Sequence, residues 1–532
     1  MSVPAVRSRE LAPQEWLFLG VVIAFWSVFV IALGKDTSWD FRNYHWYIPY
    51  AFLNGRMGFD VAVAHQATYY NPLLDVPFYW LASHTHSWFA LGVMGAVQGA
   101  NVIPLYVLAR HAVTIEEHKL AAGALALLGV TGALTVSLYG TTYYDNVMSL
   151  FVLSSLTIVV SQRERLRDGP LGQTMSVASL AGFLAGCAVG LKLPEAPFAL
   201  GFAGALFVLG GDLKHLIARL GAGALGGLAG FALFAGYWML RMEHLTGNPL
   251  FPYFNEYFRS KLALAAPYRD MRFIPTHFWR ALFFPILFSI DWHVADDLGF
   301  QDIRVAIAYL LSICAGLFVL IGRRSRHPLI SLETAGPVFA FAAVSYVAWL
   351  RTFAIYRYIL GLEMLAPFLI AAAAGFLPMT RRSQLVLLGS VFFAILLVTR
   401  SDFIERAPLG DPYIEVALPP IPNPGKTMIL MTGDAPLGFL APSLPHQIPL
   451  LRIDGWMLQP RDGTLLTRQM KARVRQQLKE GGPLYLIADA FDMTRAHDAL
   501  KDYDLAIDWV KCRLFDTSLV GAYQFCPVLL RH

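Results

Sequence analysis

Long apolar runs separated by short polar connections dominate the chain as far as about residue 400. A helix of about 20 apolar residues is long enough to cross the hydrocarbon core of a membrane. Eleven such segments can be delimited: Trp16–Leu33, Trp88–Ala109, Leu120–Leu138, Val147–Val160, Met175–Leu191, Pro197–Leu209, Ile217–Leu240, Ile303–Ile321, Leu332–Leu350, Ile355–Leu377 and Leu385–Thr399. Val147–Val160 and Pro197–Leu209 are short for a span, so the count can change by one or two. Because backbone groups in lipid must be satisfied within each segment, we expect a polytopic α-helical membrane protein of about 11 transmembrane helices.

The composition agrees with this interpretation. Of the 532 residues, 56% are apolar and only 15% are charged, and the mean hydropathy is +0.50. These values are typical of a multi-pass membrane protein rather than of several soluble domains. The net charge of +5 is modest and is explained by the basic connections, so we expect membrane lipids but no nucleic acid as partners.

Lysine and arginine concentrate in alternate connections, which predicts the orientation in the membrane. The basic positions are Arg7 and Arg9; Arg110 and Lys119; Arg163, Arg165 and Arg167; Lys214 and Arg219; Arg323, Arg324 and Arg326; and Arg381 and Arg382. Basic connections stay on the cytoplasmic side, so the N-terminus is expected there. The loops 35–86, 139–146 and 241–302, and the tail after residue 400, are then expected on the outer face.

The first outer loop, residues 35–86, is polar and aromatic. Apolar and aromatic residues recur at helical spacing from Phe41 to Phe52, and Asn54-Gly55 follows as a stop signal. A second short element is expected from Pro72 to Leu81. Amphipathic helices rich in tryptophan and tyrosine favour a membrane interface, so we expect interfacial helices lying on the outer leaflet.

The tail after residue 400 has a different character. Strand-like runs at Thr427–Met431 and Leu484–Ile487 alternate with a charged helical stretch at Leu466–Leu478. We therefore expect a membrane domain, 1–400, followed by a small α/β domain on the periplasmic side, 401–532. Cys512 and Cys526 fall in this tail, where a disulfide is permitted, but the sequence leaves their pairing open. Cys187 and Cys314 fall in apolar segments and are expected to be packing residues.

Acids, bases and aromatic rings converge on the outer face. Asp40 and Asp145 are the acids, and Lys192, Arg351 and Arg357 are the bases. A carboxylate can take the proton of an acceptor hydroxyl, and cations can stabilise a departing phosphate. The chain holds no GxxxxGK[ST] or GxGxxG motif, so chemistry driven by a nucleotide is not expected. These residue types together suit the transfer of a sugar from a lipid-linked donor.

Three stretches carry a resemblance to a known family: WDFRNYHWYIPYAFLNGRMGFD, YYNPLLDVP and TGNPLFPYFNEYF. With the long first loop and its early acid, they resemble bacterial members of the GT-C superfamily of integral-membrane glycosyltransferases, over about residues 10–400. The resemblance implies an inverting transfer from a polyprenyl-phosphate-sugar donor to a hydroxyl of a glycan or lipid acceptor, at the outer face of the bacterial inner membrane. It implies Asp40 as the catalytic base and Asp145 as a second catalytic carboxylate.

The resemblance has limits in this chain. There is no tripeptide like the WWDYG-type signature of oligosaccharyltransferases, so protein N-glycosylation is not expected. No cofactor and no metal ligand set is assigned, and a role for a divalent cation stays open. Substrate contacts are expected from Asp36, Tyr44, His45, Lys192, Asn248, Arg351 and Arg357.

Each of these residues also has a structural alternative. Asp40 could cap the helix that follows it, and Asp36 is its rival as the base. His45 could simply form a hydrogen bond at the interface, and Asp145 could cap its own helix. Lys192 could pair with Glu195, Arg357 with Glu363, and Arg351 could be a solvated end charge. Arg357 and Glu363 are six residues apart and do not lie on adjacent turns of one face, which favours a partner elsewhere.

Two other classes of function compete with an enzyme. A transporter or flippase of lipid-linked glycans would need polar residues along a path to the cytoplasmic side, whereas the ionisable residues crowd the outer face. An assembly component with the tail as a binding module would explain the tail but not the acids of the first loop.

Overall fold

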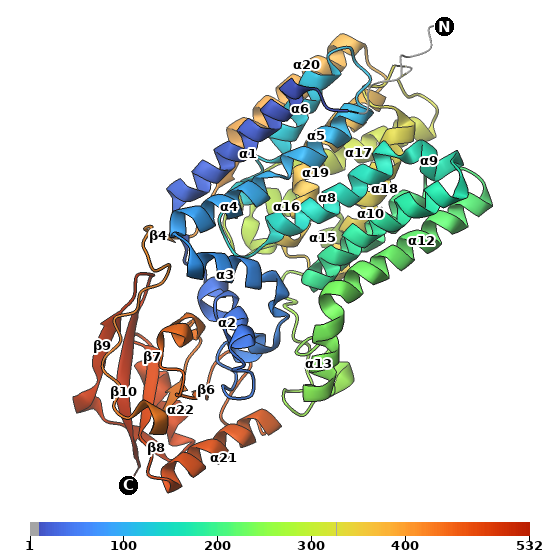
Figure 1. The fold of residues 1–532 in the computed structure, drawn as a ribbon. Helices are drawn as coiled ribbons and strands as arrows, with labels where there is room; N and C mark the ends of the chain where they lie inside the picture. The colour runs from blue at the N-terminus through green and yellow to red at the C-terminus, as the bar shows by residue number, and fades with distance from the viewer. Residues whose placement is uncertain (1–9, 326, 532) are drawn as a thin grey trace.

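The computed structural model describes residues 10–325 and 327–531, and it is mostly helical with a small sheet region near the C-terminus (Figure 1). Arg7, Arg9 and Arg326, on which part of the predicted orientation depends, lie outside the described residues. The helical part contains α1 Pro13–Leu33, α4 Ser87–Gly99, α5 Val102–Ala112, α6 His118–Gly129, α7 Ala133–Ser137, α8 Asp145–Ser161, α9 Arg163–Asp168, α10 Leu171–Leu191, α11 Ala196–Phe207, α12 Leu213–Phe231, α13 Tyr237–Thr246, α17 Arg304–Leu320, α18 Leu332–Thr352, α19 Leu360–Phe376 and α20 Arg381–Val398.

Every one of the eleven apolar segments falls on one to three consecutive helical elements. Within the described ranges, seven helical stretches are long and apolar enough to cross a membrane: Pro13–Leu33, Ser87–Ala112, Leu171–Leu191, Leu213–Thr246, Leu332–Thr352, Tyr356–Phe376 and Arg381–Val398. Four apolar helices are shorter: His118–Gly129, Asp145–Ser161, Leu193–Phe207 and Arg304–Leu320. The structure is thus compatible with a multi-pass membrane protein, whereas eleven crossings are not established.

The expected span Leu120–Leu138 is not a single helix. It is broken into α6 and α7, because Gly132 adopts an extended conformation between them. The carboxylate of Glu363 occupies the space beside Gly132, and a Cβ atom on this glycine would lie 1.9 Å from its Oε1. A buried acid on another helix therefore sets this break, and the apolar pattern alone does not indicate it.

The helices differ in what they bury. Helix α19 is buried along its whole length at the centre of the bundle. Helices α10 and α12 approach closely through small residues, since a Cβ atom on Gly182 would lie 2.0 Å from the carbonyl oxygen of Gly223. Helices α1 and α20 instead bury few of their apolar side chains, as expected of helices that face lipid.

The first loop forms a π-helical turn, Phe41–His45, followed by α2, Tyr47–Leu53. Two short 3₁₀ turns, His65–Tyr69 and Pro72–Leu74, lead to α3, Val76–His84. The expected helical stretch and its end at Asn54 are confirmed.

The rings of Trp46, Tyr47 and Tyr50, which the sequence suggested for the membrane interface, are buried within the protein. The turn Gly438–Ser443 of the C-terminal domain packs on both helical pieces. Tyr413 of the same domain stacks on the ring of Trp46, and His446 stacks on that of Tyr50.

The C-terminal domain is built on a six-stranded sheet. Its elements are β5 Met428–Met431, β6 Leu450–Arg452, α21 Leu465–Lys479, β7 Leu484–Asp489, α22 Met493–Lys501, β8 Leu505–Ile507, β9 Arg513–Asp516 and β10 Ala522–Leu530. The strand order is β6-β5-β7-β10-β8, with β9 also paired to β10; β6, β5 and β7 are parallel and β10 is antiparallel to its neighbours. Both strand-like runs and the charged helix of the sequence are found here. A disulfide joins Cys512 to Cys526.

Small elements connect these parts. Strand β1, Lys35–Asp36, pairs with β4, Arg406–Ala407, and β2, Phe300–Gln301, pairs with β3, Arg400–Ser401. The long loop 241–302 contains α14 Asn255–Phe258, α15 Phe278–Leu282 and α16 Phe284–Ile290. Of the two remaining cysteines, Cys187 is buried as expected, whereas Cys314 is exposed on α17.

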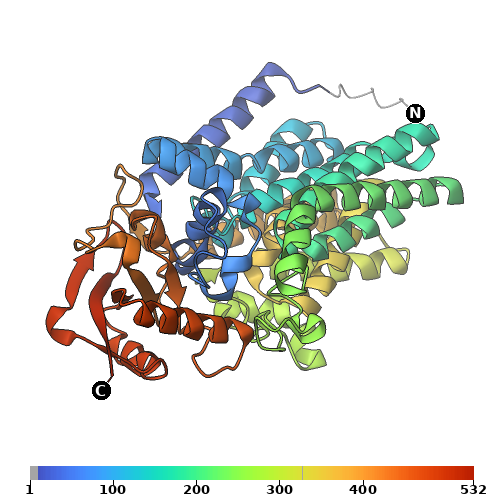
Figure 2. The ribbon, with the colours of Figure 1, turned by 60° about the horizontal axis from the view of Figure 1, so that its bottom comes forward.

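The first loop is fixed to the C-terminal domain by backbone and side-chain hydrogen bonds. Val61 donates to the carbonyl oxygen of Leu450 at 2.9 Å, and Arg452 donates back to Val61 at 3.0 Å. The buried Arg56–Asp60 ion pair continues this joint, because Asp60 also accepts a hydrogen bond from the backbone of Leu450. Figures 1 and 2 both show α2 and α3 between the helical part and the sheet. The domain is thereby held beside the loop that carries Asp40.

Candidate functional site

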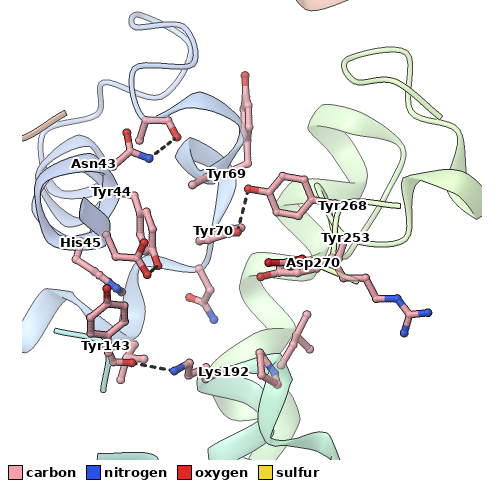
Figure 3. A pocket seen from close by; sticks show the side chains of 18 of the residues that line it. Asn43, Tyr44, His45, Tyr69, Tyr70, Tyr143, Lys192, Tyr253, Tyr268 and Asp270 are labelled. Carbon is pink, nitrogen blue, oxygen red and sulfur yellow. Dashed lines mark hydrogen bonds between the residues drawn. The ribbon is translucent and has the colours of Figure 1, made fainter. Parts of the chain in front are cut away.

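A cavity of about 520 Å³ opens where the first loop, the 241–302 loop, the helical part and the C-terminal domain meet. In Figure 3, Tyr44, His45 and Tyr70 of the first loop face Tyr253, Tyr268 and Asp270 across this space, with Tyr143 and Lys192 at one side. Five of the residues singled out in the sequence line it: Asp40, Tyr44, His45, Lys192 and Arg357. They come from three separate parts of the chain, and only the fold brings them together.

Asp40 lies half-buried immediately before the π-helical turn. Its backbone is already helical and its side chain makes no capping hydrogen bond, so the alternative that Asp40 caps this helix is wrong. Instead its Oδ2 atom accepts a hydrogen bond from the Tyr44 hydroxyl, one helical turn on, at 2.7 Å. The carboxylate is therefore oriented from one side and borders the cavity on the other.

Arg357 presents its guanidinium group to the same cavity. Its backbone N–H donates to Oδ2 of Asp296 at 2.9 Å, and the guanidinium lies 4.8 Å from the ring centroid of Tyr143 and 5.2 Å from that of Tyr358. The Nε atom is buried and has no hydrogen-bond partner within the described part of the chain. One terminal N–H group donates to the Tyr358 hydroxyl at 3.4 Å. The aromatic faces hold the cation without using its remaining N–H donors, which stay available to an anion.

Lys192 forms an ion pair with Asp145 and donates to the backbone oxygen of Tyr143 at 2.9 Å. Its partner is thus Asp145 and not Glu195. Asp145 itself is buried in the first turn of α8 and is not among the residues that line the cavity. Its action on the site passes through the position and charge of Lys192.

His45 is held by Asp75, whose Oδ1 atom lies 2.6 Å from Nδ1 of the ring. Burial raises the pKa of Asp75, while the contact with His45 opposes this rise. The two side chains border the cavity next to Asp40 and Tyr44, so His45 is both part of a buried hydrogen bond and available to a ligand.

Besides Asp145, three of the expected site residues lie away from the cavity. Asp36 is buried and accepts hydrogen bonds from the backbone N–H and the hydroxyl of Thr142, at 2.8 and 3.0 Å, so it braces the 139–144 turn and is not a rival base. Asn248 is buried within the long loop, where it bonds to the backbone of Leu250 and Tyr253. Arg351 is exposed at the end of α18 and does not line the cavity.

The structure adds cavity residues that sequence reasoning missed. Asp296 is buried beside Arg357, and burial raises the pKa of its carboxyl group to about 6, against the opposing effect of the arginine. The Tyr70 hydroxyl donates to that of Tyr268 at 3.0 Å, and the ring of Tyr253 stacks on that of Tyr70. The only sequence signal for Asp296 was a group of acids between residues 291 and 302. The tyrosines gave none, because aromatic residues are abundant throughout the chain.

A second charged group lies away from this cavity, and its residues are fully buried. Arg304 pairs with Asp302, with 2.7 Å between Nε and Oδ2, and Oε1 of Glu363 accepts two hydrogen bonds from Thr135. Glu363 is therefore not the partner of Arg357. We call Asp302, Arg304 and Glu363 the sealed cluster, and Asp40, Lys192 and Arg357 the cavity cluster.

The cavity was also compared with the ligand sets that hold metal ions. Across residues 10–325 and 327–531, no three or more histidine, cysteine, aspartate or glutamate side chains gather as a metal site. Asp291 and His293 form an exposed pair on the long loop.

Comparisons of the chain with protein-family models, curated proteins and solved structures found no match. The residues that line the cavity are therefore the basis for assigning a function.

Proposed function

We propose that this protein is an inverting glycosyltransferase of the GT-C type. It moves a sugar from a polyprenyl-phosphate donor to a hydroxyl group of a glycan or lipid acceptor, at the outer face of the bacterial inner membrane. The observation that carries the proposal is that one cavity is bordered both by the oriented carboxylate of Asp40 and by the two cations Lys192 and Arg357.

The reaction assigns each of these groups a task. The acceptor oxygen attacks the anomeric carbon while Asp40 takes its proton, and a positioned base of this kind contributes about 10²–10⁴-fold to a rate. The bond from the anomeric carbon to the phosphate oxygen breaks, and the polyprenyl phosphate leaves with the electron pair. Arg357 and Lys192 hold the phosphate and stabilise the charge that develops on it.

The shape of the cavity supports a lipid-linked donor. Its volume is within the range of small-molecule sites, about 300–1,000 Å³, so it has room for a sugar phosphate but not for a polyprenyl chain. Leu191, the last residue of α10, and Met239, within α13, add an apolar wall to the cavity. The neighbouring Leu240 is exposed on the same helix, where a lipid tail could remain in the bilayer.

In the predicted orientation, the cavity opens on the outer face. It lies at the end of the helical part shared by the loops 35–86 and 241–302 and the C-terminal domain, which the distribution of lysine and arginine assigns to the outer face. The proposal accordingly includes a cytoplasmic N-terminus and a periplasmic C-terminal domain.

The test is transfer from a panel of radiolabelled polyprenyl-phosphate sugars by the purified protein in lipid, with wild type compared with Asp40→Asn. We expect transfer by wild type from at least one donor, and loss of turnover in Asp40→Asn with binding of that donor retained. No transfer from any donor, with the lipid instead moving between leaflets, would reject the enzyme in favour of a transporter. Full turnover in the variant would reject Asp40 as the base.

A further inference from the structure

The rim of the cavity is made jointly by the first loop and the C-terminal domain. Trp39 comes from the first loop, whereas Asp434 follows β5 and Trp456 follows β6. Both tryptophan side chains are partly open to solvent, Trp39 with 36% and Trp456 with 45% of its surface exposed. Aromatic rings beside a few convergent polar groups are typical of a cavity that binds a ligand, so these two rings indicate a binding surface.

Trp39 is fixed in place from two directions. Its indole N–H donates to the backbone oxygen of Asp434 at 3.0 Å, and its ring lies parallel to that of His65, with 5.9 Å between the centroids. Because Trp39 immediately precedes Asp40, the exposed indole is held one residue from the proposed base.

From Trp456, aromatic rings continue into the cavity. The ring of Trp456 packs edge-on against Tyr268 at 5.4 Å, and Tyr268 is hydrogen-bonded to Tyr70. The ring of Tyr70 in turn contacts Tyr44, the residue that donates to Asp40. A continuous aromatic wall therefore leads from the rim to the carboxylate.

The loop that carries Asp434 is braced from within the C-terminal domain. Buried Arg452 donates to the backbone oxygens of Gly433 and Ala435 at 2.6 and 2.5 Å. Arg495 bridges Oδ2 of Asp434 and Oδ2 of Asp454, at 2.5 and 2.6 Å. The carboxylate of Asp434 is therefore positioned at the rim by a rigid support, as expected of a recognition residue.

We propose that this rim, formed by Trp39, Trp456 and Asp434, is the acceptor subsite and that it binds a saccharide unit of the acceptor. Sugar rings have apolar C–H faces that pack on indole rings, and hydroxyl edges that donate to carboxylates. The word acceptor rests on the proposed glycosyltransferase function; the binding of a saccharide does not. In this role the C-terminal domain selects the acceptor, and the aromatic wall guides its hydroxyl group to Asp40.

The test uses the full-length protein in lipid nanodiscs and two kinds of probe, a set of free oligosaccharides and a set of lipid-linked saccharides. Binding is measured without donor, and the acceptor KM is measured with donor. We expect Trp456→Ala to raise the saccharide Kd and the acceptor KM about tenfold or more, with donor affinity unchanged, as for the loss of a stacked ring. Trp456→Phe should recover part of this loss. The matched control is Trp509→Ala, because Trp509 is an exposed tryptophan of the same domain that does not line the cavity.

The outcomes separate this inference from the proposed function. Continued transfer with an unchanged acceptor KM in Trp456→Ala would overturn the acceptor subsite and leave the glycosyltransferase standing. Saccharide binding that depends on Trp456, without transfer from any donor, would support the saccharide site and overturn the glycosyltransferase. Equal dependence on Trp456 for free and lipid-linked saccharides supports recognition of the sugar. Binding of lipid-linked forms alone, unaffected by Trp456→Ala, would overturn the inference.

Discussion

The cavity cluster and the sealed cluster each contain an aspartate and an arginine, but under opposite conditions. In the sealed cluster all three side chains are fully buried, and Arg304 is held by the carbonyl oxygens of Leu128 and Thr131 and by Asp302. In the cavity cluster the side chains of Asp40, Lys192 and Arg357 are half-buried and border open space.

The two clusters differ in the groups that contact each arginine. Arg304 spends its donors on the backbone at the break between α6 and α7, so its charge stabilises that break. Arg357 rests on tyrosine faces and leaves donors toward the cavity. Arg304 therefore maintains the fold, whereas Arg357 keeps N–H donors that a ligand can use.

The largest expected effect is on stability, from Arg304→Met. This variant leaves Asp302 buried without its partner, which typically costs about 3–5 kcal/mol of unfolding free energy. We expect a clearly lower Tm by thermal denaturation in lipid, with turnover per folded molecule close to wild type. A Tm equal to that of wild type would mean that the sealed cluster does not hold the α6–α7 break.

Arg357→Gln should have the opposite profile. The removal of a cation from the leaving phosphate is expected to lower turnover by about 10²–10³-fold, with a Tm close to wild type. Donor affinity measured on the same preparation should also fall. Arg357→Lys is the matched control, since it keeps the charge and should retain part of the activity. Unchanged turnover in Arg357→Gln would remove Arg357 from the site.

A smaller effect is expected from pH, through Asp296. Its pKa is raised to about 6 by burial, so the carboxylate that competes for Arg357 becomes neutral as the pH falls from 7 to 5. The donor phosphodiester keeps its charge over this interval. We therefore expect donor Kd to decrease by up to about tenfold over this interval, which corresponds to one pKa unit of interaction.

The variant Asp296→Asn should bind donor with the same affinity across this interval, and a wild-type Kd independent of pH would contradict the coupling.

The raised pKa of Asp296 also makes the free energy of unfolding depend on pH. A carboxyl group whose pKa is raised above its usual 3.8 holds its proton more tightly when folded. Its contribution to stability is therefore fully present below about pH 4 and is lost as the pH rises through about 6.

The smallest effect is expected from Arg351→Gln. Arg351 is exposed and lies outside both clusters, so the change in unfolding free energy should stay within about 0.5 kcal/mol. Turnover and donor Kd should match wild type. A loss of turnover here would show that the site extends beyond the cavity as drawn in Figure 3.

Much of the fold could be predicted because long apolar runs in the sequence indicate helices. Each apolar run had to be helical, and each proved to be helical. The break in Leu120–Leu138 could not be predicted, since it depends on Glu363 more than 200 residues away. The packing of the C-terminal domain on Trp46 and Tyr50 could not be predicted either, because exposed and covered aromatic rings look alike in a sequence.

The candidate site was predictable only in part. Lys192 and Arg357 were noticed because charged residues are rare beside apolar segments. Asp36 and Asp40 look equivalent in the sequence, and they differ only because the backbone of Thr142 satisfies Asp36 and not Asp40. Asp434 and Trp456 could not be found, because the chain reaches the cavity again after about 400 residues.

The most direct test compares two identical substitutions, Asp40→Asn and Asp302→Asn, for Tm and for sugar transfer per folded molecule in the same lipid preparation. We predict that Asp40→Asn keeps the wild-type Tm and loses transfer by about 10²–10⁴-fold. We predict that Asp302→Asn lowers the Tm, as expected when one partner of a buried pair is removed, while its folded molecules transfer sugar at the wild-type rate. Wild-type transfer by Asp40→Asn, or a selective loss of transfer in Asp302→Asn at an unchanged Tm, would contradict the proposed role of Asp40.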